Sequence, residues 1–343
     1  MIDRSAPVSP QQASKRHQLD VGAVVIGRNE GGRLSTCIKA LHDCHTVVYV
    51  DSGSNDGSPA LAANLGANVV ELNMESPFTA ARARNAGFER LCQLTDGGEY
   101  VQFVDGDCEV LPGWISGAVN FLESHPEISV VCGRRFERNP TISIYNAMCH
   151  REWNTPVGET HACGGDALMR AAALRTVGGF ANEQVAHEEP ELCGRLRKAG
   201  FRIWRLDLPM TLHDAAIFRL RQFYNRSRRA GFGMTQCLVR SGCNIDPNAR
   251  DIVRRSISWV IILPIIILSS TLVWKPAAVA FLIYPTQILR HAVKDQQGAG
   301  GDLRNRMHVA ALSMIGKFAE AHGSIEFVLR KVMHQKMTGI FYK

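Results

Sequence analysis

Short apolar runs alternate with segments of helical spacing along the first part of the chain. The runs at residues 21–26, 46–50, 68–72 and 100–104 are rich in β-branched and aromatic residues, which is typical of strands covered on both faces. Segments with the apolar spacing of amphipathic helices lie between them. Three strand–helix repeats joined by short loops predict an α/β fold with a doubly wound, mostly parallel sheet.

Polar residues stand where three of these strands end. They are Asn29 and Glu30 after the first strand, Asp51 after the second, and Asp105 and Asp107 after the fourth. The carboxyl ends of parallel strands meet in one crevice, where such sheets bind ligands. The Gly-rich turn at residues 27–32 matches neither G-x-G-x-x-G nor G-K-[ST], which disfavours a dinucleotide site and a P-loop.

The pair Asp105 and Asp107, separated by Gly106, suits a divalent ion. Two hard oxygen ligands this close are typical of Mg²⁺ or Mn²⁺ sites that also hold phosphate. An ordinary acidic turn is the alternative, because Asp and Gly are common turn residues.

A helix is predicted to start at Ser76 and Pro77 and to carry Arg82 and Arg84. Residues two apart do not share a helix face, so we expect one arginine to point at the site and the other at solvent.

The most apolar part of the chain lies further along. Residues 257–274 carry no charge over 18 positions and include Pro264, and residues 277–289 add 13 uncharged positions after a Lys-Pro break. Basic residues flank both ends, which by the positive-inside rule places both flanks in the cytoplasm. The pattern predicts a membrane hairpin over 257–289, as two short spans or a re-entrant loop. A helical pair buried against the rest of the protein is the alternative.

The charge of the chain is split between its two parts. Residues 1–214 carry a net charge of −6 and residues 215–343 a net charge of +13, which together give the +7 of the 343-residue chain. An acidic front and a basic, apolar back suggest a soluble catalytic part joined to a part that faces anionic lipid. Nucleic acid is disfavoured as a partner, because the basic part also contains the most apolar run.

The ten cysteines show no C-x-x-C spacing, which argues against a structural zinc site. The first 20 residues are polar and have no apolar core of a secretory signal, so we expect residues 1–19 to be a disordered tail. Both features fit a cytoplasmic chain with reduced thiols.

Six segments follow one another in an order that resembles one enzyme family. They are VVIGRNEGGRL, VYVDSGSNDGS, ARARNAGF, VQFVDGDCEVLPGW, CGGDALMRAAALRTVGGF and HEEPELCGRLRKAGFRIW. In this order they resemble the family 2 glycosyltransferases of the GT-A fold, over about residues 21–214. The resemblance implies a nucleotide-sugar donor, of which UDP-sugars are the commonest, and a Mg²⁺ or Mn²⁺ ion held through the Asp-x-Asp element. It also implies inverting transfer to an acceptor hydroxyl that a carboxylate deprotonates.

The resemblance also implies roles for the polar residues of the crevice. Asn29, Glu30 and Asp51 would line the nucleoside pocket with Arg84 and Asn85 beside it, while Asp105 and Asp107 would hold the ribose and the metal-diphosphate. Where the family usually has Glu-Asp, this chain has Glu188 and Glu189. Glu189 is the expected base and Glu188 the alternative, with Glu191 expected to cap a helix over 192–199. Helix N-terminal acids that interact with the dipole are the non-catalytic interpretation.

Two further groups complete the expected site. Gly165 and Asp166 would shape the acceptor side. His213, after a strand predicted over 202–206, would be the third metal ligand, oriented by a carboxylate such as Asp214; a structural histidine is the alternative.

Basic and aromatic residues at helical spacing follow at 218–234. Arg226, Arg228 and Arg229 could contact diphosphate or lipid phosphate, and an amphipathic helix on a membrane surface fits equally well. The processive members of the family carry a Gln-x-x-Arg-Trp element that this segment does not match, so processivity is in doubt.

These features predict a catalytic domain over 20–215, an amphipathic basic helical connector over 216–250, and a helical region over 251–343 that contains the membrane hairpin. The predicted enzyme transfers a sugar to a glycan or lipid-linked acceptor at the cytoplasmic face of the inner membrane, in cell-surface or exopolysaccharide synthesis. A non-catalytic nucleotide-sugar-binding membrane subunit that acts as a scaffold is the alternative function.

Overall fold

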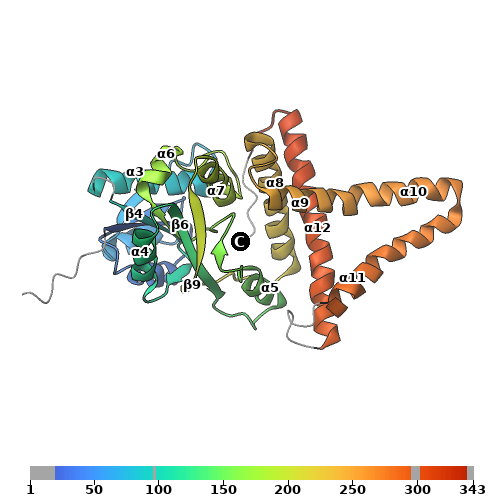
Figure 1. The fold of residues 1–343 in the computed structure, drawn as a ribbon, viewed down its shortest axis with the longest axis horizontal. Helices are drawn as coiled ribbons and strands as arrows, with labels where there is room; N and C mark the ends of the chain where they lie inside the picture. Colours follow the sequence, from blue (N-terminus) through green and yellow to red (C-terminus); the bar gives the residue numbers. More distant parts are fainter. Residues whose placement is uncertain (1–19, 96–97, 295–301, 338–343) are drawn as a thin grey trace, which may run out of the picture.

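A nine-stranded mixed sheet lies at the centre of the N-terminal part of the protein (Figure 1). The computed structural model describes residues 20–95, 98–294 and 302–337, so the predicted tail over 1–19 lies outside the described residues. The strands are β1 Val21–Gly27, β2 Thr46–Asp51, β3 Asn68–Glu71, β4 Tyr100–Asp105, β5 Cys108–Val110, β6 Ile128–Glu137, β7 Gly158–Glu159, β8 Ala167–Arg170 and β9 Arg202–His213.

The sheet is half parallel and half antiparallel. Its order is β3-β2-β1-β4-β8-β6-β9-β5, with β7 also paired to β9. The first four strands are parallel, as predicted, because a helix crosses over between each consecutive pair. The β8 strand lies antiparallel between β4 and β6, and β5 and β7 pair antiparallel with β9. The expectation of a mostly parallel sheet therefore holds for the first half of the sheet, and the fold is a mixed α/β sheet.

Helices cover both faces of the sheet, and a separate helical layer follows it. In the α/β part they are α1 Gly32–Lys39, α2 Ser58–Asn64, α3 Ala80–Thr95, α4 Trp114–Ser124, α5 Ile144–Glu152, α6 Ala171–Thr176 and α7 Glu188–Lys198. The C-terminal helices are α8 Leu220–Ser241, α9 Pro247–Ile257, α10 Leu263–Val273, α11 Ile283–Lys294 and α12 Leu303–Val332, with the π-helical turn Ser258–Ile262 and the 3-10 helix Lys275–Leu282.

Three of the predicted boundaries are wrong. The helix α3 begins at Ala80, because the Thr79 hydroxyl accepts a hydrogen bond from the N–H of Arg82 at 3.1 Å and so closes its first turn. The strand β9 continues to His213, seven residues beyond its predicted end, because β5 and β6 pair with that extension.

The helix α7 also begins earlier than predicted, at Glu188. Its N-cap is His187 in a left-handed conformation (φ 67°). Glu191 lies inside the first turn and accepts a hydrogen bond from Arg195 at 2.8 Å. The expectation that Glu191 caps a helix starting at residue 192 is therefore wrong.

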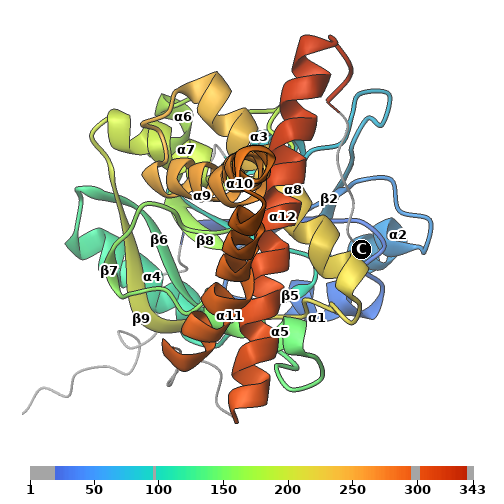
Figure 2. The ribbon, with the colours of Figure 1, turned by 90° about the vertical axis from the view of Figure 1, so that its right-hand side faces the viewer.

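The helices α8 and α12 lie side by side against the α/β part (Figure 2). Glycines allow their close approach: a Cβ at Gly231 would overlap the carbonyl of Glu320, and one at Gly323 would overlap the carbonyl of Arg228. This contact holds the C-terminal helical layer beside α7, on the side where β1 and β4 end.

An apolar arm, formed by residues 258–294, projects from this layer (Figure 1). Its outgoing leg continues α9 through the π-helical turn into α10, and its returning leg is α11, which packs on α12. Pro264, on the outgoing leg, lacks the N–H that would bond to the preceding turn of the helix. The hydroxyl of Tyr284, on the returning leg, donates a hydrogen bond to the carbonyl of Trp259 on the outgoing leg at 2.6 Å.

The tip of the arm is apolar and exposed. Leu272 and Val273 are 88% and 91% exposed, so the alternative of a helical pair buried against the catalytic part is wrong. Within the described part of the chain, one helical run, Pro247–Val273, has the length and apolar character needed to cross a membrane, and 11% of its most apolar window is buried.

Candidate active site

A crevice of about 250 Å³ opens where β1, β4 and β9 end. The helices α3, α7 and α8 complete its walls. Of the residues predicted from the sequence, those that line it are Glu30, Arg84, Asp105, Asp107, Glu188, Glu189, His213 and Arg229. The polar ends of the first and fourth strands therefore converge as expected, whereas Asn29 and Asp51 do not line the crevice. The helix α7 brings the candidate base to the same crevice.

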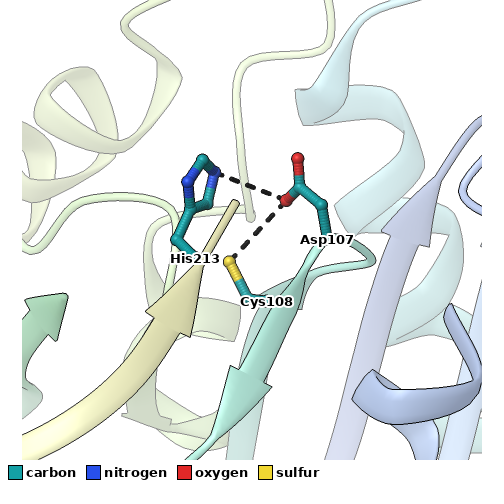
Figure 3. A group of neighbouring side chains, drawn as sticks. All are labelled: Asp107, Cys108 and His213. Atoms are coloured by element: carbon teal, nitrogen blue, oxygen red, sulfur yellow. Dashed lines mark hydrogen bonds and ion pairs between the residues drawn. The ribbon is translucent and has the colours of Figure 1, made fainter. Parts of the chain in front are cut away.

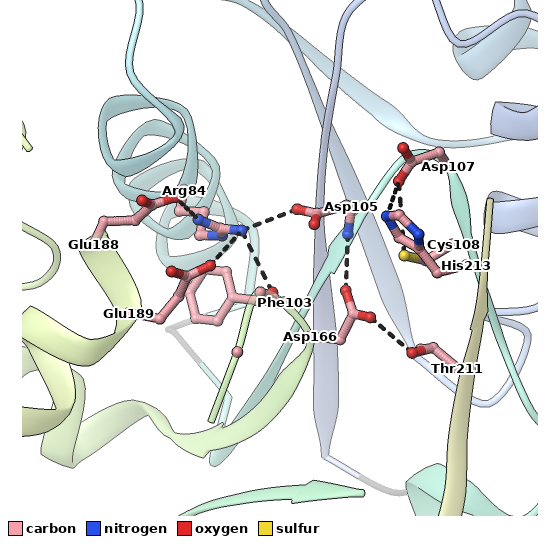
Figure 4. Close-up of polar contacts among 12 residues, drawn as sticks. Arg84, Phe103, Asp105, Asp107, Cys108, Asp166, Glu188, Glu189, Thr211 and His213 are labelled. Carbon is pink, nitrogen blue, oxygen red and sulfur yellow. Dashed lines mark hydrogen bonds and ion pairs between the residues drawn. The ribbon is translucent and has the colours of Figure 1, made fainter. Parts of the chain in front are cut away.

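Arg84, on α3, is the centre of the charged network in this crevice (Figure 4). Its guanidinium is buried and lies 2.7 Å from Glu188, 2.9 Å from Asp105 and 3.3 Å from Glu189. Arg82, two residues earlier, instead donates to backbone carbonyls of the segment that precedes the same helix. As predicted, one arginine faces the site and the other does not.

Glu189 carries the chemistry expected of a general base. Burial, together with the negative charges of Glu188 and Asp105, raises its pKa to about 7, although the Arg84 guanidinium acts in the opposite direction. A base is most effective when its pKa lies near the working pH. Glu189 is therefore poised to accept a proton near neutral pH.

Gly165 lies against this network and leaves no space for a side chain. A Cβ there would lie 2.8 Å from the Asp105 carboxylate, 3.1 Å from the Arg84 guanidinium and 3.2 Å from the Glu189 carboxylate. The contact of these three groups depends on the glycine.

Asp166 is placed differently from the expectation. It is fully buried below Asp105, whose N–H it accepts at 3.2 Å, and it also accepts the Thr211 hydroxyl at 2.7 Å and pairs with Arg135 at 2.6 Å. A carboxylate with these three partners positions Asp105 and Arg135. Because the Asp166 side chain is fully buried, it has no exposed surface with which to contact an acceptor sugar.

Asp107 and His213 form a second cluster at the end of β9 (Figure 3). The imidazole Nε2 lies 3.4 Å from the Asp107 carboxylate, and the Cys108 thiol donates to the same oxygen at 3.7 Å. One ligand atom from each of the three residues lies within 4.8 Å of the others. Burial raises the pKa of the Cys108 thiol, so it stays protonated and is a poor ligand, whereas carboxylate and imidazole suit Mn²⁺ or Mg²⁺.

Asp105 belongs to the Arg84 network and not to the cluster of Asp107 and His213. It forms a separate group of potential ligands with Cys108 and Asp166, and burial raises its pKa despite the opposing charge of Arg84. The two carboxylates of the Asp-x-Asp pair thus belong to two different groups of side chains: Asp105 contacts Arg84 and Asp107 contacts His213.

The comparisons with known proteins point to one family. Residues 23–178 match the family described as glycosyl transferase family 2. Over this segment, which is less than half of the chain, the chain is similar to the family 2 glycosyltransferases. Its matched segment contains the crevice residues of β1, α3 and β4, while α7 and His213 follow it.

Two curated relatives and one solved structure are similar to this chain. The succinoglycan biosynthesis protein ExoA of Rhizobium meliloti is 27% identical over 195 residues, which cover 52% of this chain and 58% of that protein. The pre-mycofactocin glycosyltransferase of Mycobacterium tuberculosis is 25% identical over 219 residues, covering 60% of this chain and 45% of that protein. This chain thus spans about half the length of the curated relatives it matches.

The mannosyltransferase PcManGT of Pyrobaculum calidifontis shares the fold. It superimposes with a TM-score of 0.57 at 17% identity, over 91% of this chain and 88% of that one. Because the overlap extends beyond the residues matched to the family, the shared architecture includes part of the C-terminal helical layer.

The residues expected to line a nucleoside pocket are engaged within their own loops. The carboxylate of Asp51 accepts the Tyr49 hydroxyl, the N–H groups of Gly53 and Ser54, and the Ser54 hydroxyl. Asn29 accepts the N–H of Asn55 at 2.8 Å. These two residues shape the loops after β1 and β2 without lining the crevice.

Glu30 and Asn85 also have partners in the protein. Glu30 lines the crevice and pairs with Arg33 at 2.7 Å. Asn85 holds the segment at Phe180 with three hydrogen bonds and does not line the crevice.

Two residues of β6 that lie beside the site were not predicted from the sequence. Arg135 pairs with Asp166 and lies 3.7 Å from Asp105. Glu137 lies 4.0 Å from the Nδ1 of His213, and Asp214, the expected orienting carboxylate, pairs with Arg33 at 3.6 Å. Burial alone would raise the pKa of Glu137. The nearby His213 and the N–H groups of Ala215 and Asn139 have a larger, opposite effect, so the pKa is lowered.

Proposed function

We propose that this chain is a glycosyltransferase that moves a sugar from a nucleotide-diphospho-sugar to a hydroxyl of a glycan or lipid-linked acceptor, with inversion, in cell-surface or exopolysaccharide synthesis. The observation that carries the proposal is the position of Glu189. Its carboxylate, with a pKa of about 7, shares the Arg84 guanidinium with Asp105. The candidate base and the donor-side carboxylate therefore contact the same guanidinium nitrogen.

The reaction follows as a single displacement. The acceptor oxygen forms a bond to the anomeric carbon while the bond from that carbon to the donor diphosphate breaks, and the nucleoside diphosphate leaves. An alcohol is a weak nucleophile, so its proton passes to Glu189 as it attacks. Arg84 keeps Glu189 in position and balances the charge of Asp105 and Glu188.

Asp107 and His213 are the residues that would hold the divalent ion, because their ligand atoms already lie 3.4 Å apart. A bound Mn²⁺ or Mg²⁺ would neutralise the charge that develops on the leaving diphosphate. Glu137 lies on the far side of the His213 ring, where it favours the tautomer with a free Nε2. The structural relative from Pyrobaculum calidifontis was solved with GDP-mannose and Mn²⁺, which supports a nucleotide sugar and an ion in this crevice.

The proposed location is the cytoplasmic face of the inner membrane. The arm exposes an apolar surface at its tip, and nucleotide sugars are made in the cytoplasm. The similarity to a succinoglycan biosynthesis protein supports the assembly of an exported glycan as the process.

The test is thermal stabilisation of the full chain by a panel of UDP- and GDP-sugars, with and without Mn²⁺ or Mg²⁺. A ligand at 100 times its Kd adds about 2.7 kcal/mol to the free energy of unfolding. We expect one donor class to raise the Tm only with the ion, and Asp107→Ala to lose this shift. Asp43 is exposed, so Asp43→Ala is the control and should retain the ion-dependent rise in Tm. No stabilisation by any nucleotide sugar, or an unchanged ion-dependent shift in Asp107→Ala, would contradict the proposal.

A further inference from the structure

A cavity of about 550 Å³ lies apart from the crevice, at the strands β6 and β9 and the segment over 154–157. None of its lining residues lines the crevice as well. Arg134 lines it from β6, whereas its neighbour Arg135 lies 3.7 Å from Asp105, because successive side chains of a strand point to opposite faces. The cavity is therefore a separate site, with the volume of one that holds a small organic ligand.

Two arginines contribute the positive charge of this cavity. Arg205, on β9, is 3% exposed, and Arg134 is half-buried. Burial and the nearby charge of Arg205 lower the pKa of the Arg134 guanidinium, which reflects repulsion between the two cations. Both stay charged at neutral pH, since the pKa of arginine lies far above that range. The fold thus keeps two like charges close together.

The protein itself offers these cations little compensation. Within the described residues, only Asp207 forms an ion pair with either of them: its carboxylate lies 3.8 Å from Arg205, and its side chain is 90% exposed. An ion pair with so exposed a partner is worth little. A buried charge without a buried counter-charge is destabilising, so an anion bound between the two arginines would relieve this cost.

Both guanidiniums also have N–H groups that lack acceptors. In the described part of the chain, Arg134 donates to the carbonyl of His150 at 3.3 Å, and Arg205 donates to the carbonyl of Leu206 at 3.1 Å. The Nη1 of Arg134 and the Nε of Arg205 are buried without a hydrogen-bond partner. The ring of Phe136 lies 5.1 Å from the Arg134 Cζ and supports that guanidinium. Buried arginine donors of this kind indicate a site for an oxyanion, which a guanidinium binds through paired hydrogen bonds.

The remaining polar groups favour a sugar phosphate over other anions. The side chains of Asn154, Thr155 and Asp207 line the same cavity, and amide, hydroxyl and carboxylate groups are partners for sugar hydroxyls. A phosphate monoester carries a charge of about −1.5 to −2 at neutral pH, which two arginines balance. The additional charge of a diphosphate would meet the Asp207 carboxylate. A hexose monophosphate therefore matches the charge, the polar groups and the volume.

We propose that this cavity binds a hexose monophosphate. The phosphate lies at the guanidiniums of Arg134 and Arg205. The sugar hydroxyls bond to Asn154, Thr155 and Asp207. Because the cavity shares no lining residue with the crevice, this ligand is neither the donor nor the acceptor of the proposed transfer, and its binding does not depend on that function.

The binding test uses the full chain in detergent and EDTA. The probes are glucose 1-phosphate, glucose 6-phosphate, mannose 1-phosphate, glucose and inorganic phosphate. EDTA removes divalent ions, so that the crevice cannot hold a phosphate through a metal. We expect at least one hexose phosphate to bind about tenfold or more tightly than glucose and inorganic phosphate, because it alone combines both parts. Hydrogen bonds to charged groups are strong, so Arg134→Gln and Arg205→Met should each raise its Kd about tenfold or more.

Two control variants separate this site from the rest of the chain. Arg202→Gln changes another arginine of β9, which is 42% exposed and pairs with Glu159 at 2.8 Å, and it should bind the hexose phosphate as the wild type does. Asp107→Ala changes the crevice and should also bind it with wild-type affinity. Without ligand, Arg205→Met should have a Tm equal to or above that of the wild type, because it removes a buried charge that lacks a buried partner.

Three outcomes would overturn the proposal. They are the failure of every hexose phosphate to bind more tightly than glucose and inorganic phosphate, loss of binding in Asp107→Ala, and wild-type affinity in Arg134→Gln. A lower Tm of ligand-free Arg205→Met would show that Arg205 supports the fold. The affinity of Arg134→Gln, at the half-buried arginine, then decides the proposal alone.

Discussion

Arg84 lies with its guanidinium 3.3 Å from the carboxylate of Glu189 (Figure 4). The same nitrogen lies 2.9 Å from Asp105, so one side chain links the end of β4 to the start of α7. The distance between the donor-side carboxylate and the candidate base is thus set by a single buried cation.

We predict that Arg84→Met destabilises the protein. Removing one partner from a buried ionic network leaves uncompensated charge and costs about 3–5 kcal/mol. Chemical denaturation measures the loss in the free energy of unfolding. Arg90→Met, on the exposed side of the same helix, where Arg90 donates to Gln93, should cost far less. Similar losses in both variants would show that the network contributes no special stability.

Transfer should increase with pH through about 7. The pKa of Glu189 is raised to about 7, so the residue is protonated and inactive as a base below that value and charged above it. The logarithm of kcat/KM against pH should have a slope near one below the midpoint.

Glu189→Gln should lower transfer by about 10²- to 10⁴-fold and remove this pH dependence. Glu183→Gln, at a carboxylate that is 85% exposed, should leave both unchanged. Full transfer by Glu189→Gln would favour Glu188 as the base or the scaffold function.

Gly165→Ala should impair transfer more than stability. The new Cβ would lie 2.8 Å from Asp105 and 3.2 Å from Glu189, which forces the two carboxylates apart. A displacement of about 1 Å at a reacting centre can cost about 100-fold in rate. Gly32→Ala, where an added Cβ meets no atom within 4 Å, is the control. If Gly165→Ala keeps the kcat of the wild type, the distance between Asp105 and Glu189 does not control the rate of transfer.

The first four strands and the carboxylates at their ends were predictable because they depend on local pattern. The apolar run of β4 places Asp105 at the carboxyl end of a parallel strand, where such sheets bind ligands. The same holds for Glu189, which stands in the first turn of an amphipathic helix.

The second half of the sheet, where β6 pairs parallel with β9 and the other pairs are antiparallel, was not predictable in this way. The carboxylate of Asp166 accepts the N–H of Asp105 from 61 positions along the chain, and no local pattern specifies that pairing. Arg135 and Glu137 did leave a signal, since charged residues two apart on a strand share one face. Only the tertiary structure shows that this face meets Asp105 and His213.

His213→Ala should raise the concentration of Mn²⁺ needed for half-maximal donor stabilisation by tenfold or more, because it removes one of the two proposed ligands. Ion titrations at a fixed donor concentration measure the change. Glu137→Gln should act in the same direction, since partners of a ligand contribute roughly 10-fold or more to affinity. His322→Ala, at a histidine bonded to Tyr224 in the helical layer, is the control. If His213→Ala needs the same Mn²⁺ concentration as the wild type, His213 is not a ligand of the ion.

The arm should hold the protein on membranes through its tip. Leu272 and Val273 are 88% and 91% exposed, and transferring one such side chain from water into lipid is favourable by about 1.5–3 kcal/mol. Leu272→Asp removes that gain and adds a charge that resists burial, so co-flotation with vesicles of anionic lipid should fall about tenfold or more. The matched control is Ile142→Asp, at an apolar residue that is 60% exposed in the α/β part, which should float as the wild type does. Because the substitution lies at the far end of the arm from the crevice, ion-dependent stabilisation by the nucleotide sugar should be the same in all three proteins. Equal flotation of Leu272→Asp and the wild type would show that the arm meets another protein, or nothing, instead of lipid.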